Sequence, residues 1–177
     1  MSFVSEADAE IASLANALEC PVLSNDSDFF IFDVLGGFIP LRPFKWQRCP
    51  SKARIFYRRK LAQHFRIRPE LLPLFASLVG NDYVTSELLK RFHQRLLGTS
   101  GGKEEKFQKI SKLLSQAPTE EEKAKEFVFR SVPGENELRR AVEISLQEYT
   151  ITERPLVGHF LRKIGRASCR ERVCQYV

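Results

Sequence analysis

The sequence lacks a long hydrophobic run, since none of its apolar stretches approaches the ~18 residues that a membrane-spanning helix needs. It also lacks the regions of a secretory signal peptide. Its 177 residues include only four cysteines, one tryptophan and one methionine. These absences argue against a membrane protein and a secreted disulfide scaffold. We therefore expect an intracellular chain with no membrane partner.

Several patterns of catalytic chemistry are missing as well. The three histidines, His64, His93 and His159, form no H-x-x-x-H pair, and no Ser/His/Asp grouping can be defended. The glycine-rich stretch 98–102 lacks the Gly-Lys-Ser/Thr pattern of a phosphate loop. What is left is a chemistry of carboxylates and basic residues.

The C-terminal residues 164–177 are unlike the rest of the chain. Their sequence, IGRASCRERVCQYV, has neither a helical nor a strand period. It resembles the translation of a sequencing-adapter read-through, and we interpret it as a non-native tail. Without it only Cys20 and Cys49 are left, and they do not have the spacing of a metal site.

One stretch, 21–33, organises the first part of the chain. Its apolar start, Pro21-Val22-Leu23, predicts a short buried strand. Two carboxylates, Asp26 and Asp28, follow the strand, and bulky apolar residues follow them. The carboxyl ends of strands are where open α/β sheets bind ligands. The alternative is that Asn25 or Asp26 only caps a short helix.

A second acidic pair opens the preceding element. Apolar residues at helical spacing predict an amphipathic helix over Ser5–Glu19, and Glu6 and Asp8 stand in its first turn. A helix followed by a buried strand is half of a repeating α/β unit. Here too a structural interpretation is open, because Ser5 and Asp8 can form a variant of the capping box.

Acidic residues are absent from residues 34–69. The same stretch holds ten basic residues interleaved with aromatic ones. Such a pattern can neutralise phosphates and stack on unpaired bases, although a solvated helix with aromatics facing a core would look similar. We predict a nucleic-acid surface formed by Lys45, Arg48, Lys52, Arg54, Arg58, Arg59 and Lys60.

The rest of the sequence predicts one strand followed by helices. Glycines at 36–37 predict a turn before a strand over 38–41, and an apolar helix over 70–79 ends at Gly-Asn-Asp-Tyr, which contains Asp82. Ordinary turn chemistry also explains that acid. Further helices are predicted over 86–97, 104–116, 119–130 and 136–149.

Three motifs in this order carry a resemblance to a known family. SEADAE, VLSNDSDFFIF and LLPLFASLVGNDYV resemble the internal nuclease region of the flap-endonuclease superfamily. VLSNDSDFF followed by GGFIPL is most similar to the asteroid homologues. The resemblance covers about residues 2–84. It implies an α/β fold with a partial PIN-like parallel sheet over 1–97, followed by a helical region over 98–163.

The resemblance also implies a site. In the family, the matching acids bind two divalent cations, Mg²⁺ or Mn²⁺, at the carboxyl edge of the sheet. Two such ions can activate a water and stabilise the leaving oxygen of a phosphodiester. Without cations, converging carboxylates would repel one another and raise some of their own pKa values. The residues matched here are Glu6, Asp8, Asp26, Asp28 and Asp82.

The chain departs from the family in two ways. The N-terminal segments that contribute further metal-binding acids precede the region matched here, so we interpret the chain as an internal fragment that is inactive by itself. The span 84–98 also lacks the glycine pattern of the helix–two-turn–helix that grips duplex DNA, and asteroid-type proteins lack it too. The basic stretch is the expected replacement.

The sequence therefore predicts part of a metal-dependent, structure-specific endonuclease acting on DNA with single-stranded or branched features. Such a substrate would suggest the nucleus. Two alternatives stay open, a non-catalytic PIN-like scaffold acting in signalling or protein interaction, and a metal-free nucleic-acid-binding module. Protein partners are not predicted.

Overall fold

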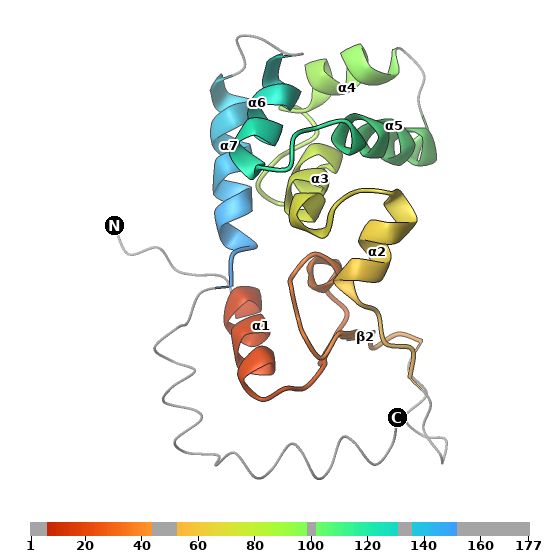
Figure 1. Cartoon of the computed structure of the whole chain (residues 1–177), viewed down its shortest axis with the longest axis vertical. Coiled ribbons are helices and arrows are strands. Elements are labelled where there is room, and N and C mark those ends of the chain that lie inside the picture. Colours follow the sequence, from red (N-terminus) through yellow and green to blue (C-terminus); the bar gives the residue numbers. More distant parts are fainter. Residues whose placement is uncertain (1–6, 44–52, 99–101, 131–135, 152–177) are drawn as a thin grey trace. The chain divides into compact units, whose positions relative to one another are not determined.

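The computed structural model describes residues 7–43, 53–98, 102–130 and 136–151 (Figure 1). These residues divide into two compact units. The first extends to Lys60 and includes residues 150–151, and the second spans Leu61–Tyr149. Helix α2 (Arg58–Phe65) contains the boundary between them.

The first unit begins with a helix that packs on a small parallel sheet. Helix α1 (Ala7–Ala17) contacts strand β1 (Val22–Ser24), and β1 pairs in parallel with β2 (Phe38–Pro40). In the register of the pair, Val22 lies opposite Phe38. The connection between the strands contains a short 3₁₀ helix, η1 (Ser27–Phe30). A crossover of about a dozen residues is the usual minimum for parallel strands.

Aromatic side chains hold this crossover against the sheet. The ring of Phe38 lies 5.8 Å from that of Phe29 and 4.8 Å from that of Phe30, centroid to centroid. Phe56 joins them, with its ring 5.2 Å from Phe30 and its backbone bridged to Phe38 in the antiparallel sense. Edge-to-face pairs of this kind add to the burial of apolar area. These contacts fix Phe29 and Phe30, the two residues that directly follow Asp28.

A close backbone approach explains one glycine of this unit. A Cβ built on Gly36 would lie 2.3 Å from the carbonyl carbon of Cys20 and 2.6 Å from the nitrogen of Pro21. Any side chain would therefore push apart the turn before β2 and the start of β1. At Gly37 the reason is different, because its backbone angle φ of 84° is one that glycine adopts more easily than other residues.

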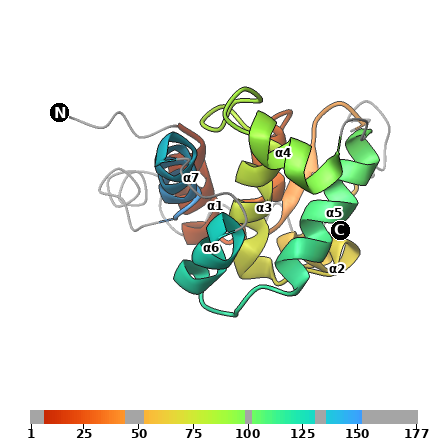
Figure 2. The same ribbon diagram turned by 90° about the horizontal axis from the view of Figure 1, so that it is seen from above.

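The second unit is a helical assembly around α3 (Leu72–Val79). Every turn of this helix is apolar and five of its residues are buried, as expected for a helix surrounded by others. Figure 2 shows α3 between α5 and α7, and it contacts both. The other elements of the unit are η2 (Pro69–Leu71), α4 (Lys90–Leu97), α5 (Lys103–Ser115), α6 (Glu121–Arg130) and α7 (Asn136–Glu148).

The predicted mixed α/β class with a parallel sheet is confirmed, and the described residues are mostly helical. The predicted helices over 104–116, 119–130 and 136–149 match α5, α6 and α7 to within two residues. The helix predicted over 86–97 was wrong at its start, because turns precede α4 up to Leu89. No helix among the described residues is long and apolar enough to cross a membrane. The PIN-like assignment and the division at residue 97 stay predictions.

Candidate active site and nucleic-acid surface

The loop that follows β1 is ordered by its own polar side chains. Ser24 Oγ accepts a hydrogen bond from the backbone N–H of Asp26 at 3.1 Å, and Asp26 Oδ1 accepts one from the N–H of Asp28 at 2.9 Å. Asn25 Oδ1 accepts from the N–H of Arg42, beyond the neighbouring strand, at 3.1 Å. The acidic pair therefore stands on a short, well-connected turn at the carboxyl end of β1.

Asp26 is the N-cap of η1, so the capping interpretation is correct for this residue. Capping uses one carboxylate oxygen and leaves the negative charge in place. Asp26 is exposed and Asp28 is half-buried. Helix α1 contacts η1 and carries the half-buried Asp8 in its first turn. Asp8 and Asp28 are therefore carried by two elements, α1 and η1, that pack against each other.

The predicted metal site is covered only in part by the residues that the structure describes. Among the described residues, no three His, Cys, Asp or Glu side chains are grouped so that they could hold a metal ion. Glu6, one of the predicted ligands, lies outside the described residues. Asp82 belongs to the second unit. The donor type, carboxylate oxygen, fits Mg²⁺, while the grouping of the five acids stays a prediction.

Asp82 lies in a tight loop that several helices support. Gly80 ends α3 with φ 113°, a backbone conformation that favours glycine. Asn81 Oδ1 then accepts hydrogen bonds from the N–H groups of Tyr83 and Val84 at 3.2 and 2.9 Å. The turn interpretation is therefore correct for Asn81, whereas Asp82 itself points out as an exposed residue.

Side chains from α7 and from the residue that follows it complete the support of this loop. Asn81 Nδ2 donates to Ser145 Oγ at 2.6 Å and to the hydroxyl of Tyr149 at 3.3 Å. Ser145 Oγ also shares a 2.8 Å hydrogen bond with Ser77 Oγ of α3. Ser77 and Ser145 are both fully buried. Because buried polar groups are costly unless paired, this network fixes the loop to α7.

Two basic side chains bind the last carbonyls of α3. His93 Nε2 donates to the carbonyl of Leu78 at 2.7 Å, and Lys106 Nζ donates to that of Val79 at 2.9 Å. Burial lowers the pKa of His93 below 6.5, the hydrogen bond to Leu78 opposes this, and the charge of Lys106 lowers the pKa further. Burial, and then the charge of Lys103, lower the pKa of Lys106. Cations at a helix C-terminus complement its dipole.

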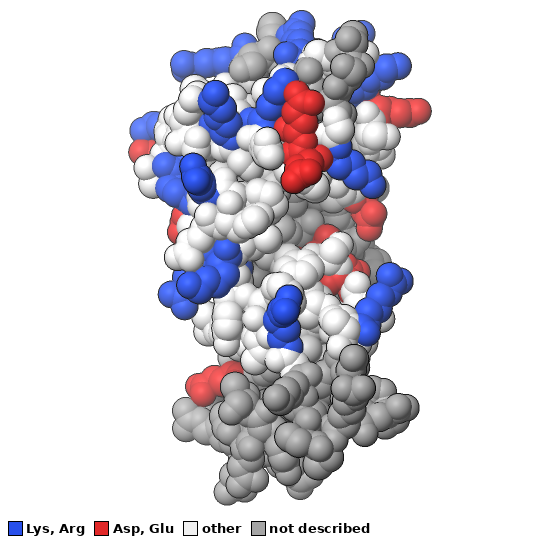
Figure 3. Space-filling view, turned by 90° about the vertical axis from the view of Figure 1, so that its right-hand side faces the viewer, with Lys and Arg blue, Asp and Glu red and all other residues white. Residues whose placement is uncertain are grey.

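The predicted basic surface is described only in part. Lys45, Arg48 and Lys52 lie outside the described residues. Arg54, Arg59 and Lys60 are exposed. Arg58 is different, because its side chain is 15% exposed and its guanidinium lies 3.7 Å from the carboxylate of Asp33. On the face in Figure 3, Lys and Arg side chains are dispersed and interrupted by acidic ones rather than joined in one patch.

The aromatics of the basic stretch divide between two roles. Phe56 packs in the aromatic core of the first unit, as the solvated-helix alternative predicts for aromatics. Tyr57 is 42% exposed. Phe65, at the end of α2, contacts Phe75 of α3 and Phe107 of α5. No sequence pattern indicates this last grouping, because Phe107 lies outside the basic stretch.

Comparison with known proteins places the chain among recognised relatives. A family model described as the FAM120A-like domain matches residues 65–153, nearly the span of the second unit. The chain is 32% identical over 164 residues to the single-strand DNA endonuclease ASTE1 of Danio rerio, with 88% of this chain and 24% of the relative covered.

Two further relatives are similar over shorter stretches. The single-strand DNA endonuclease ASTE1 of Homo sapiens is 39% identical over 123 residues, covering 63% of this chain and 18% of the relative. Protein asteroid of Drosophila melanogaster is 28% identical over 157 residues, covering 57% and 18%. The chain thus spans at most 24% of the length of these relatives. No solved structure matches it.

Proposed function

This chain belongs to the family of the asteroid homologues and carries a FAM120A-like domain, and from that premise we propose that it forms part of a single-strand DNA endonuclease. The observation that carries the proposal is the Asp26–Asp28 pair, held on a hydrogen-bonded turn at the carboxyl end of a parallel strand. The Danio rerio relative, which matches 88% of this chain, is named a single-strand DNA endonuclease.

The catalytic part of the proposal is a divalent-metal site in a PIN-like sheet. Carboxylate oxygens are the ligands that Mg²⁺ and Mn²⁺ favour, and the contact between α1 and η1 supports placing Asp8 with the Asp26–Asp28 pair. We include Glu6 and Asp82 as the further ligands. Bound cations would supply an activated water and stabilise the leaving oxygen. The chain's own acids would hold and orient them.

The nucleic-acid part of the proposal is the exposed end of the basic stretch. Arg54, Arg59 and Lys60 are exposed and belong to the same unit as the acidic turn. Such side chains neutralise phosphates and position the strand without reading its sequence. We propose that the intact protein works in the nucleus on DNA with single-stranded features.

The capping role of Asp26 makes a sharp test possible. Asn is as good an N-cap as Asp, so Asp26→Asn keeps the hydrogen bond to the N–H of Asp28 and removes the charge. We expect the intact protein to cleave a labelled single-stranded oligonucleotide with Mg²⁺ or Mn²⁺ and not after chelation. Asp26→Asn should lower the cleavage rate by at least about 10- to 100-fold, because even the loss of a residue that only orients a metal ligand typically has that effect. Asp33→Asn, an exposed acid of the same unit, is the control.

The other outcomes identify the alternatives. Cleavage at the normal rate by Asp26→Asn, with its thermal stability unchanged, would remove this acid from the catalytic set. Binding of the oligonucleotide that survives chelation, with no product at any metal concentration, would indicate a metal-free binding module. Neither binding nor cleavage by the intact protein would indicate a non-catalytic scaffold.

A further inference from the structure

A pocket of about 770 Å³ lies between the end of α2 and α5, entirely within the second unit. Helices α2 and α5 lie side by side in both ribbon views (Figures 1 and 2). The residues of its lining that matter here are His64, Phe65, Arg66, Glu104, Phe107 and Lys112. None of them is one of the five acids proposed as metal ligands. The volume of the pocket is in the range of small-molecule sites.

The floor of the pocket is aromatic. The ring of Phe65 lies 4.7 Å from that of the buried Phe75 and 5.9 Å from that of Phe107, centroid to centroid. Phe75 closes the group at 5.9 Å from Phe107. Phe65 and Phe107 are only half-buried, and both line the pocket. Their remaining surface is available to a flat, apolar ligand such as a base.

The rim of the pocket is mainly cationic. Arg66 and Lys112 are both exposed, and Glu104 is the one acid of the lining. His64 lies against the aromatic floor, with its ring 5.1 Å from that of Phe65. Aromatic faces flanked by cations are the combination that binds single-stranded nucleic acid, through base stacking and phosphate neutralisation.

The backbone of Arg66 adds a second observation. The N–H of Arg66 donates to the carbonyl of Gln63 at 3.1 Å, and the N–H of Ile67 donates to that of Ala62 at 3.0 Å. This is the Schellman ending of a helix, whose left-handed position is usually glycine. Here it is arginine with φ 55°. An unfavourable backbone conformation kept by a charged residue is a reason to look for a functional role.

We propose that this pocket binds an unpaired base of single-stranded DNA, with the rings of Phe65 and Phe107 packed against the base. Arg66 and Lys112 bind the phosphates on either side of it. The substrate class rests on the proposed function, whereas the pocket itself uses none of the acids that the proposed function needs. It therefore holds the strand without taking part in cleavage.

Binding measured without cleavage tests this proposal. The intact protein is titrated into a fluorescein-labelled oligo(dT) in the presence of a chelator, and anisotropy gives the Kd. Lys112→Glu should weaken binding about 5-fold or more at low salt, because it removes one phosphate contact and adds a repulsive charge. Lys90→Glu is the matched control, since Lys90 is an exposed lysine of α4 outside this pocket. At ~0.15 M salt it should change the Kd less than about 2-fold, because charges more than ~8 Å apart are then largely screened.

A second comparison isolates the base. An oligomer with the same phosphates and abasic sugars should bind the unaltered protein about 5-fold or more weakly than oligo(dT), as expected from the stacking of a base on an aromatic ring. Phe107→Leu keeps the apolar bulk and loses one of the two rings, so the difference in Kd between the two oligomers should become smaller. If Phe107→Leu lowers the melting temperature, Arg66→Gly replaces it, because glycine suits the left-handed position. That variant should keep the fold and still weaken binding.

Two results would overturn the proposal. One is an unchanged Kd for Lys112→Glu and Arg66→Gly, and the other is equal binding of the abasic oligomer and oligo(dT) by the unaltered protein. The intact protein could give either result and still cleave single-stranded DNA, with the cleavage abolished by Asp26→Asn. In that case the proposed function stands and only the proposal for this pocket is wrong. Photocrosslinking of an iodouracil oligonucleotide gives an independent readout, with the adduct expected in peptides 64–66 or 107–112.

Discussion

Asn81 illustrates how a single residue organises the loop that carries Asp82. Its amide accepts two backbone hydrogen bonds inside the loop and donates two, one to Ser145 of α7 and one to Tyr149 just after that helix. Asn16 of the first unit has a related role on a smaller scale. It accepts from the N–H of Leu35 at 2.7 Å and donates to the carbonyl of Asp33 at 2.9 Å, both in exposed positions.

The two asparagines allow a matched prediction. Asn81→Ala should lower the free energy of unfolding by about 2–3 kcal/mol, because it leaves partly buried donors and acceptors without partners. Asn16→Ala should cost about 0.5–1.5 kcal/mol, since water can replace its exposed hydrogen bonds. Urea unfolding of both variants measures the difference. Equal losses would show that the network between Asn81 and α7 adds nothing beyond a local turn.

His93 gives the second unit a dependence on pH. Burial lowers its pKa in the folded chain below the ordinary value of 6.5. The unfolded chain therefore takes up a proton at a higher pH than the folded chain does. The contribution of His93 to stability is complete above about pH 6.5 and is lost as the pH falls through the lowered pKa.

We expect the free energy of unfolding to decrease on acidification from pH 7 to pH 5, and His93→Gln to reduce that decrease. The glutamine amide can still donate a hydrogen bond to the carbonyl of Leu78, but it takes up no proton. Urea unfolding at several pH values, followed by far-UV circular dichroism, provides the measurement. His64→Gln is the control, since His64 is exposed. The same pH dependence in the His93→Gln variant would assign the acid sensitivity to other groups.

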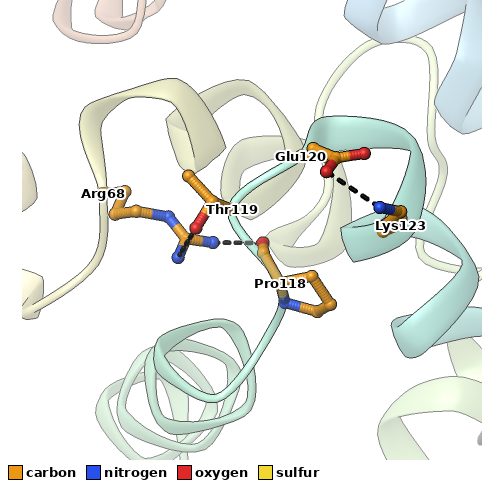
Figure 4. A network of polar contacts seen from close by, with 5 residues as sticks. All are labelled: Arg68, Pro118, Thr119, Glu120 and Lys123. Carbon is orange, nitrogen blue, oxygen red and sulfur yellow. Dashed lines mark hydrogen bonds and ion pairs between the residues drawn. The ribbon is translucent and has the colours of Figure 1, made fainter.

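Connections between elements depend on equally specific contacts. The guanidinium of Arg68, just before η2, holds the segment that joins α5 to α6 (Figure 4). Its Nη2 donates to the carbonyl of Ala117 at 3.0 Å and also to that of Pro118, and its Nη1 donates to Thr119 Oγ1 at 3.3 Å. The ion pair between Glu120 and Lys123 lies close by, with both side chains more than 60% exposed.

These two interactions should differ in their effect on stability. Arg68→Lys should lower the free energy of unfolding by about 1–2 kcal/mol, because a lysine cannot reproduce the planar fork that reaches several acceptors. Lys123→Ala should change it by less than about 0.5 kcal/mol, as is usual for exposed ion pairs. Thermal melts of the two variants decide the matter. A larger loss for Lys123→Ala than for Arg68→Lys would contradict this ranking.

Most elements could be predicted because their signals are local. The all-apolar α3 and the periodic α5 to α7 follow from residue spacing. The parallel sheet, in contrast, was expected from the family resemblance. The left-handed backbone at Arg66 could not be predicted, since glycine or asparagine normally marks such a position. The aromatic pocket could not be predicted either, because Phe65 and Phe107 come together only when α2 and α5 pack.

At the scale of the whole molecule, the candidate site was predictable in its parts and not as an assembly. Sequence patterns located Asp26, Asp28 and Asp82 at the ends of elements. The structure has Asp26 and Asp82 in short loops and Asp28 in the 3₁₀ helix η1 that follows β1. Whether they share a cation depends on contacts between distant parts of the chain, which no local pattern encodes. The same segments carry ordinary capping and turn contacts, so those interpretations are correct, while the role of the acids as metal ligands stays a prediction.

The net charge of +6 leads to a prediction about the binding of DNA. Reversing the charges of Arg58, Arg59 and Lys60 should weaken the binding of single-stranded DNA by the intact protein. Most of the effect should come from the exposed Arg59 and Lys60, because Arg58 already pairs with Asp33.

Salt dependence separates phosphate contacts from a general charge effect. Each lost phosphate contact should lower the slope of log K against log salt by about 0.7 for a single strand, so Arg59→Glu with Lys60→Glu should lower it by about 1.4. Lys123→Glu with Arg140→Glu is the control, since it changes the net charge equally at exposed positions of α6 and α7. An equal change of slope in both double variants would mean that only the total charge matters. An unchanged affinity and slope for Arg59→Glu with Lys60→Glu would place the strand elsewhere on the protein.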